Sequence, residues 1–145
     1  MQNQNYSNHR RYYTPHHFIF YPIAAALLIL ALYFADKYTD NKTGFYLLAT
    51  IIFLVIWLSF MMRQHYALLL QNRIVRLEMR VRYFQMSGKR FEPVEQKLHF
   101  KQIAALRFAS DNELPALVDR ALNENLSPDD IKKSIISWQP DHMRV

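Results

Sequence analysis

Several features that would support catalysis are scarce or missing in this sequence. The chain has no cysteine, which excludes disulfides, thiolate metal ligands and thiol nucleophiles. Its two glycines, Gly44 and Gly88, lie too far apart for a phosphate-binding G-x-x-x-x-G-K loop and are too few for a dinucleotide-binding fingerprint. Charge is also absent locally, because residues 18–35 and 45–62 include no Asp, Glu, Lys or Arg.

The two uncharged stretches predict membrane-spanning helices. Each is 18 residues long, and a helix needs about 17–25 residues to cross the hydrocarbon core. A cleaved signal peptide is the alternative for the first stretch, but Asp36 and Lys37 follow it instead of a small-x-small cleavage site. Because the stretches contain no acid, basic residue or histidine, a proton relay or ion pathway is not expected in them. Ala24, Ala31 and Ala35 either pack against the second stretch or face lipid.

The distribution of positive charge predicts an orientation. The net charge is +6, and residues 63–101 carry nine Lys or Arg against three acids, whereas residues 102–145 carry five against seven. Lysine and arginine are retained on cytoplasmic flanks. The loop at residues 36–44 has only Lys37 and Lys42, while more basic residues flank the other span ends: Arg10, Arg11, Arg63, Arg73, Arg76, Arg80 and Arg82. We therefore expect both termini in the cytoplasm and the loop outside.

The residues after the second stretch predict further helices. Residues 63–86 contain neither Gly nor Pro, so the second span should continue as one long helix until Ser87 and Gly88. Another helix is expected over residues 94–109, one after the capping sequence of residues 110–113, and one from Ser127 to Trp138. The expected fold is all-α: a transmembrane hairpin over residues 18–62, a cytoplasmic helical domain over 63–145, and a flexible cytoplasmic tail over 1–17.

The long helix carries a heptad pattern on its cytoplasmic half. Six apolar residues are spaced three and four apart: Ala67, Leu70, Ile74, Leu77, Val81 and Phe84. β-Branched residues at a and Leu at d favour a parallel dimer, and Arg73 at g could pair with Glu78 at the following e. The pattern covers fewer than three heptads, which is short for a coiled coil. It is therefore either an interaction seam, for a homodimer or another membrane protein, or the core face for the later helices.

Basic residues form a second cluster in the same region. Its members are Arg73, Arg76, Arg80, Arg82, Lys89 and Arg90. Such a cluster can bind anionic lipid or another polyanion such as RNA, each Lys or Arg near a charged membrane being worth about 1 kcal/mol. The alternative is a solvated face that also sets the orientation in the membrane.

The sequence shows no arrangement typical of an enzyme or of DNA binding. No two of the six histidines stand four apart on one predicted helix, so a metal site would need tertiary convergence. Asp129 and Asp130 are explained by the start of a helix. The turn at residues 123–127 could join a helix-turn-helix, but the net charge of −2 over residues 102–145 opposes phosphate binding. We expect no enzymatic activity, no cofactor, no metal and no DNA partner.

The carboxyl-terminal part carries a resemblance to a known family. From Leu106 to the end, LRFASDNELPALVDRALNENLSPDDIKKSIISWQPDHMRV resembles the tail of small two-span bacterial membrane proteins catalogued as domain-of-unknown-function family 6526. The Asn5-Tyr6-x-Asn8-His9 motif and the two apolar stretches are also similar. The resemblance implies a bacterial inner-membrane protein and transfers no active site. The expected function is a membrane-anchored helical scaffold or accessory subunit; the alternative is a membrane-surface module that binds anions.

Overall fold

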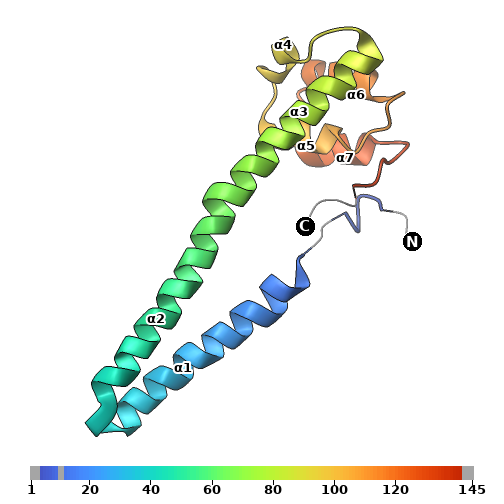
Figure 1. The fold of residues 1–145 in the computed structure, drawn as a ribbon. Helices are drawn as coiled ribbons and strands as arrows, with labels where there is room; N and C mark the ends of the chain where they lie inside the picture. Colours follow the sequence, from blue (N-terminus) through green and yellow to red (C-terminus); the bar gives the residue numbers. More distant parts are fainter. Residues whose placement is uncertain (1–3, 10–11, 142–145) are drawn as a thin grey trace. The chain divides into compact units, whose positions relative to one another are not determined.

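The computed structural model describes residues 4–9 and 12–141, which are predominantly helical (Figure 1). They contain no β-strand; an isolated bridge joins Ala109 and Trp138. The all-α prediction is confirmed. The contacts divide the described chain into two units, residues 12–69 and residues 4–9 with 70–141, and each is described by itself. Arg10 and Arg11, counted for orientation, and His142 lie outside the described residues.

The first unit is a helical hairpin. It consists of the π-helical turn η1 (Pro15–Phe20), α1 (Tyr21–Lys37), the 3-10 turn η2 (Thr39–Asn41), α2 (Lys42–Met61) and the π-helical turn η3 (Met62–Ala67). Helices α1 and α2 run side by side (Figure 1). Their buried side chains are alanines, namely Ala24, Ala31, Ala35 and Ala49. Small side chains let helix backbones approach closely, so the alanine stripe packs within the hairpin.

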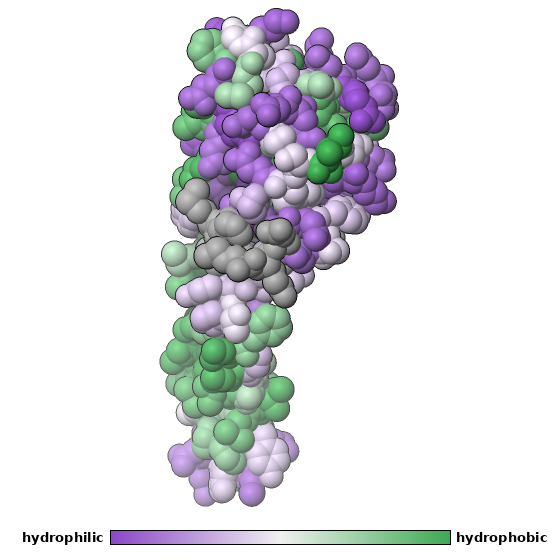
Figure 2. All heavy atoms as spheres, turned by 90° about the vertical axis from the view of Figure 1, so that its right-hand side faces the viewer, coloured by the Kyte–Doolittle hydropathy of each residue, from purple (hydrophilic) through white to green (hydrophobic). Residues whose placement is uncertain are grey.

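Most apolar side chains of this hairpin are exposed. Only 17% of the most apolar window is buried in the helix Pro15–Lys37, and only 6% in the helix Thr39–Ser87. Figure 2 shows hydrophobic side chains over the hairpin and hydrophilic ones at its turn. A core helix of a soluble protein would bury these residues. Both helices are long and apolar enough to cross a membrane.

The second unit is a small bundle around α3 (Leu68–Ser87). Helix α3 continues α2 and η3 without a break, as predicted, and ends at Gly88, whose φ of 67° is the left-handed conformation that glycine adopts easily. The short helices are α4 (Glu92–Glu95), α5 (Phe100–Leu106), α6 (Leu114–Asn123) and α7 (Pro128–Ser134). Their core includes Phe91, Ile103, Leu106, Leu114, Val118 and Ile131, all fully buried.

Two helix predictions needed correction. The helix expected over residues 94–109 is split into α4 and α5, because His99 is extended (φ −71°, ψ 149°) and its N–H donates to Gln102 Oε1 at 2.7 Å, starting a new helix. The last helix ends at Ser134, before Trp138. There the Glu113 carboxylate accepts the N–H groups of Ile136 and Ser137, which holds that segment out of the helix.

The predicted start of α7 is confirmed, whereas α6 begins later than the capping sequence predicts, at Leu114 with Glu113 as its N-cap. Glu113 Oε1 accepts the N–H of Ser110 at 3.0 Å, which is half of the expected capping box. At α7, Ser127 Oγ accepts the N–H of Asp130 at 3.2 Å, and Pro128 occupies the first turn. These local signals depend on neighbouring residues only, which is why sequence alone revealed them.

The amino-terminal segment differs from the expected flexible tail. Gln4 is buried, and its amide accepts a hydrogen bond from the Asp141 N–H (2.7 Å) and donates one to the Asp141 carbonyl (3.3 Å). The His9 ring packs against Phe108 and Trp138. Residues 4–9 therefore belong to the bundle. The sequence hid this because the contacts join residues 4–9 to residues near the other end of the chain.

Candidate functional site

The most informative surface of the bundle is an apolar stripe on α3. Five of the six seam residues lie on α3 itself, and each exposes about half of its surface: Leu70 55%, Ile74 57%, Leu77 61%, Val81 49% and Phe84 55%. We call these five residues the α3 stripe. The sixth, Ala67, is exposed in η3, where the helix is π-helical. The predicted spacing is therefore present, and its side chains are uncovered.

A different face of α3 forms the core. Val75, Met79 and Tyr83 recur every four residues and are 5% exposed or less. At about 100° per residue, the centre of this face lies about 180° from the centre of the α3 stripe. The interpretation of the seam as the chain's own core face is therefore wrong. The sequence contains this spacing of Val75, Met79 and Tyr83, but the arginines between these residues made the face look polar.

The basic cluster is largely neutralised within the chain. Arg76 Nη1 and Arg80 Nε each hold one carboxylate oxygen of Glu95, the latter at 2.6 Å, and Glu95 is only 7% exposed. The hydrogen bond from Arg80, and next to it that from Arg76, holds the pKa of Glu95 below its ordinary value, against the opposing effect of burial. One acid therefore serves two of the six predicted anion-binding residues.

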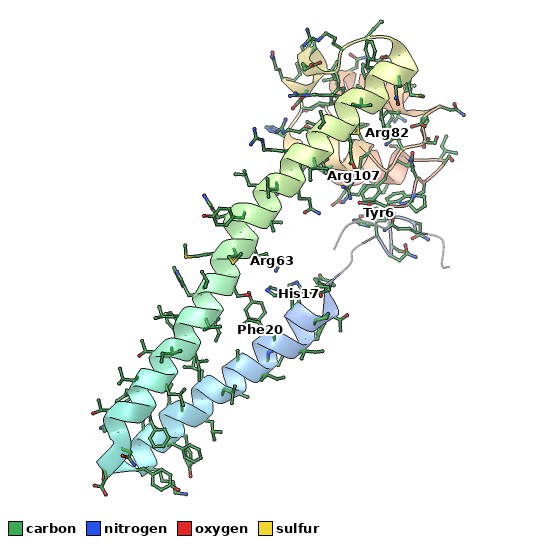
Figure 3. The ribbon with its side chains drawn as sticks, in the orientation of Figure 1. Tyr6, His17, Phe20, Arg63, Arg82 and Arg107 are labelled. Carbon is green, nitrogen blue, oxygen red and sulfur yellow. The ribbon has the colours of Figure 1, made fainter. Side chains whose placement is uncertain are left out.

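Arg82 is committed to the bundle rather than to solvent (Figure 3). Its Nη1 donates to the Arg107 carbonyl and its Nη2 to the Ala109 carbonyl, both at 2.8 Å. The same guanidinium binds Asp111 Oδ1, with Nη2 at 2.7 Å and Nε at 3.0 Å. Nη2 also donates to Gln139 Oε1 at 2.8 Å. Arg82 thus ties α3 to two later segments and has little capacity left for a ligand.

The remaining cations of the cluster differ in their partners. Arg90 donates to Glu92 Oε1 at 3.0 Å, and this hydrogen bond lowers the pKa of Glu92. Arg73 and Lys89 have no acidic partner within residues 4–9 and 12–141. The stripe's flanking acid, Glu78, has no basic partner in the same residues. Sequence reasoning missed the partners Glu95 and Asp111 because tertiary packing, not local spacing, brings them to α3.

Neither a metal centre nor a catalytic group emerges from the described geometry. Among the described residues, no three His, Cys, Asp or Glu side chains gather where they could hold a metal ion. In the hairpin, His16 Nε2 lies 3.1 Å from Ser59 Oγ, which gives the ring a polar partner. A pocket of about 260 Å³ has Lys97 as its titratable lining residue, and the Gln102 side chain beside it already donates to the Leu126 carbonyl at 2.8 Å. That lining offers no acid–base pair.

Comparison with known proteins adds a family. No curated protein and no solved structure matches the chain. A family model described as a family of unknown function, DUF6526, matches residues 1–145, the whole sequence. The resemblance noted in the carboxyl-terminal part, the amino-terminal motif and the two apolar stretches is therefore confirmed over the whole sequence. The chain belongs to the family of unknown function DUF6526.

Proposed function

We propose that this protein is a membrane-anchored helical scaffold or accessory subunit that acts through protein–protein contacts and not as an enzyme. The observation that carries the proposal is the α3 stripe. It places five large apolar side chains, about half exposed, on the side of α3 opposite to the covered face. Contiguous exposed apolar surface on a soluble domain is typical of an interaction site.

Membrane anchoring is supported by the hairpin. Its apolar side chains are exposed along two helices of sufficient length. At the turn, Lys37 Nζ lies over the rings of Tyr33 and Tyr38, at 5.7 and 5.6 Å, and Lys42 Nζ lies over Tyr46 at 5.7 Å. Lysine and tyrosine together favour the headgroup region. With the excess of arginine after α2, this supports a two-span protein of the bacterial inner membrane with both termini in the cytoplasm.

The topology has a direct test. Because the chain lacks cysteine, a single Asp40→Cys or Asp129→Cys substitution gives one thiol in η2 or α7. In intact cells, a membrane-impermeant maleimide should label Asp40→Cys. Labelling of Asp129→Cys should require membrane disruption. The reverse pattern would invert the topology, and labelling of both in intact cells would argue against a cytoplasmic bundle.

The anion-binding alternative is weakened by the ion pairs. Arg76, Arg80, Arg82 and Arg90 already contact carboxylates of the same chain. Only Arg73 and Lys89 of the predicted cluster lack an acidic partner in the described part. Two exposed cations give weak electrostatic attraction that salt screens, so we favour the apolar stripe over the basic cluster as the functional surface.

The scaffold proposal is tested by site-specific photo-crosslinking in native membranes. A photoreactive amino acid replaces Leu77, at the centre of the stripe. The matched control replaces Ile136, which is 94% exposed, apolar and in the same unit. A defined protein adduct from position 77 and none from position 136 is expected. Equal, diffuse labelling at both positions, or lipid adducts alone at position 77, would contradict a protein-binding stripe.

A further inference from the structure

We infer that the occupant of the α3 stripe is the α3 stripe of a second copy of this chain, in parallel orientation and in register. The inference rests on the proposed function, since it names the partner of the same surface. Three features of the described residues support a second copy: the residue types of the stripe, the two charges beside it that lack ion-pair partners, and the support of α3 by its own bundle.

The residue types along the stripe match a parallel pair. Ile74 and Val81 occupy a positions, and Leu70, Leu77 and Phe84 occupy d positions. β-Branched residues at a with mainly Leu at d favour two parallel strands over larger bundles. All five side chains already project from one side of α3 and are about half exposed. A second stripe of the same spacing can therefore interdigitate with them without rearrangement.

The flanking charges select the orientation. Arg73 is at g and Glu78 at the following e, and in a parallel pair g of one helix faces the next e of the other. A parallel dimer therefore forms two Arg73–Glu78 ion pairs, one on each side. An antiparallel dimer instead places Arg73 opposite Arg80 of the other copy, which repels. Within one chain, Arg73 and Glu78 have no ion-pair partner among the described residues, so both are available.

The shortness of the stripe is compensated by preorganisation. An isolated two-heptad helix is marginal because it must pay for its own ordering. Here α3 is already held as a helix by Val75, Met79 and Tyr83, which pack into the bundle core. Association therefore orders side chains only. Anchored in one membrane, two copies also share an orientation and a raised local concentration.

Disulfide trapping in the full-length protein tests the arrangement. Single-cysteine variants Leu70→Cys, Leu77→Cys and Phe84→Cys are oxidised in native membranes, with Ile136→Cys as control. Facing d positions of a parallel pair bring Cα atoms within the roughly 4.4–6.8 Å that a disulfide needs. Each stripe variant should form dimers with itself, at least about tenfold more than the control. Dimers from mixed Leu70→Cys and Phe84→Cys, with none from either of these two variants alone, would overturn the parallel arrangement.

Charge exchange tests the pairing itself. In the Leu77→Cys background, Arg73→Glu should lower the dimer yield several-fold, because it faces Glu78 of the other copy. Adding Glu78→Arg should restore the yield. Lys89→Glu, which makes the same change of charge away from the stripe, should leave the yield unchanged. Loss of yield without restoration by the double exchange would overturn the proposed register.

The two proposals fail in different ways. A photo-adduct from position 77 that contains another protein, without disulfide dimers, overturns the second-copy inference and leaves the scaffold proposal intact. Absence of both the photo-adduct and the disulfide dimer overturns both. Disulfide dimers at all three stripe positions, together with restoration by the charge exchange, support both.

Discussion

The two faces of α3 are both apolar, yet their surroundings are opposite. Val75, Met79 and Tyr83 are almost fully buried in the bundle, whereas the α3 stripe is 49–61% exposed. The exposed face carries the larger number of aliphatic side chains and the more regular spacing. Hydrophobicity along a helix therefore indicates that a face is meant to be covered, but the covering partner can lie in the same chain or in another.

The hairpin provides a second case of the same difference. Its alanines are buried between α1 and α2, while its larger apolar side chains are exposed. There the proposed covering is lipid. On α3, the charges among the stripe residues, including Arg73 and Glu78, exclude immersion in hydrocarbon because charged side chains are costly there. On α3 the covering that we propose is therefore protein.

The largest expected effect is on the stability of the bundle, and one matched pair of substitutions, one on each face of α3, tests it. Met79→Asp places a carboxylate in the core and removes a buried side chain, which should cost at least about 4 kcal/mol and unfold the bundle. Leu77→Asp, two residues away on the stripe, should change the free energy of unfolding of the monomeric bundle by less than about 0.5 kcal/mol. Thermal melts with limited proteolysis of the purified protein measure both.

Self-association should depend on the stripe and not on the stability of the bundle. In the Leu70→Cys background, Leu77→Asp should keep a protease-resistant bundle while abolishing disulfide dimers, because two carboxylates would face each other across the pair. If Leu77→Asp unfolded the bundle as Met79→Asp does, the stripe would be a core face after all and the distinction between the faces would be lost.

The next largest effect on stability is expected from replacing Arg82, and replacing Arg73 on the other side of α3 is its control. Arg82→Met removes hydrogen bonds to two carbonyls, Asp111 and Gln139. Leaving such partners unpaired should cost about 2–4 kcal/mol. Arg73→Met removes a cation without an acidic partner in the described chain, and should leave the free energy of unfolding within about 0.5 kcal/mol. Urea unfolding followed by circular dichroism compares them; equal destabilisation would contradict the described role of Arg82.

Low pH should lower the free energy of unfolding of the bundle, because Glu95 becomes protonated. Its folded pKa is lowered from 4.5 by Arg80 and Arg76, so the folded state binds fewer protons than the unfolded state. The resulting stabilisation is complete above about pH 4.5 and is lost as the pH falls through the lowered folded pKa. Glu95→Gln should cost about 1–2 kcal/mol at pH 7.

The Glu95→Gln variant also serves as the control for its own pH dependence. Unfolding curves between pH 7 and pH 3 should show a steeper loss of stability for the wild type than for Glu95→Gln. Identical slopes would mean that other carboxylates account for the acid sensitivity and that the Glu95 pairs contribute little.

The features that the sequence predicted correctly are those that depend on residues close together in the chain. Helix type, the cap at Ser127, the stop at Gly88 and the spacing of the stripe depend on residues within a few positions, and all were predicted. The pairing of Glu95 with Arg76 and Arg80, and the contact of Gln4 with Asp141, depend on how distant segments meet. No local sequence pattern predicts these long-range contacts.

The same limit explains the basic cluster. The sequence shows three cations at helical spacing and three more nearby, but the acids that neutralise four of the six lie 2 to 29 residues away. Likewise, the sequence contained both apolar faces of α3 and could not say which one the bundle would cover. Charge and hydrophobicity were visible; the partner of each was not.

The smallest effect is expected on anion binding by the two cations of the basic cluster that lack acidic partners in the described residues. Lys89→Ala, alone or with Arg73→Ala, removes the cations of the cluster that lack acidic partners in the described residues. Full-length protein reconstituted in vesicles of neutral lipid should capture anionic vesicles weakly, and these substitutions should change capture less than about twofold, since each exposed cation contributes about 1 kcal/mol at most and salt screens it. A tenfold loss on Lys89→Ala, with strong salt dependence in the wild type, would make the basic cluster a polyanion site. The α3 stripe would then be a neighbour of that site, and the difference between the two faces of α3 would concern charge as much as apolar surface.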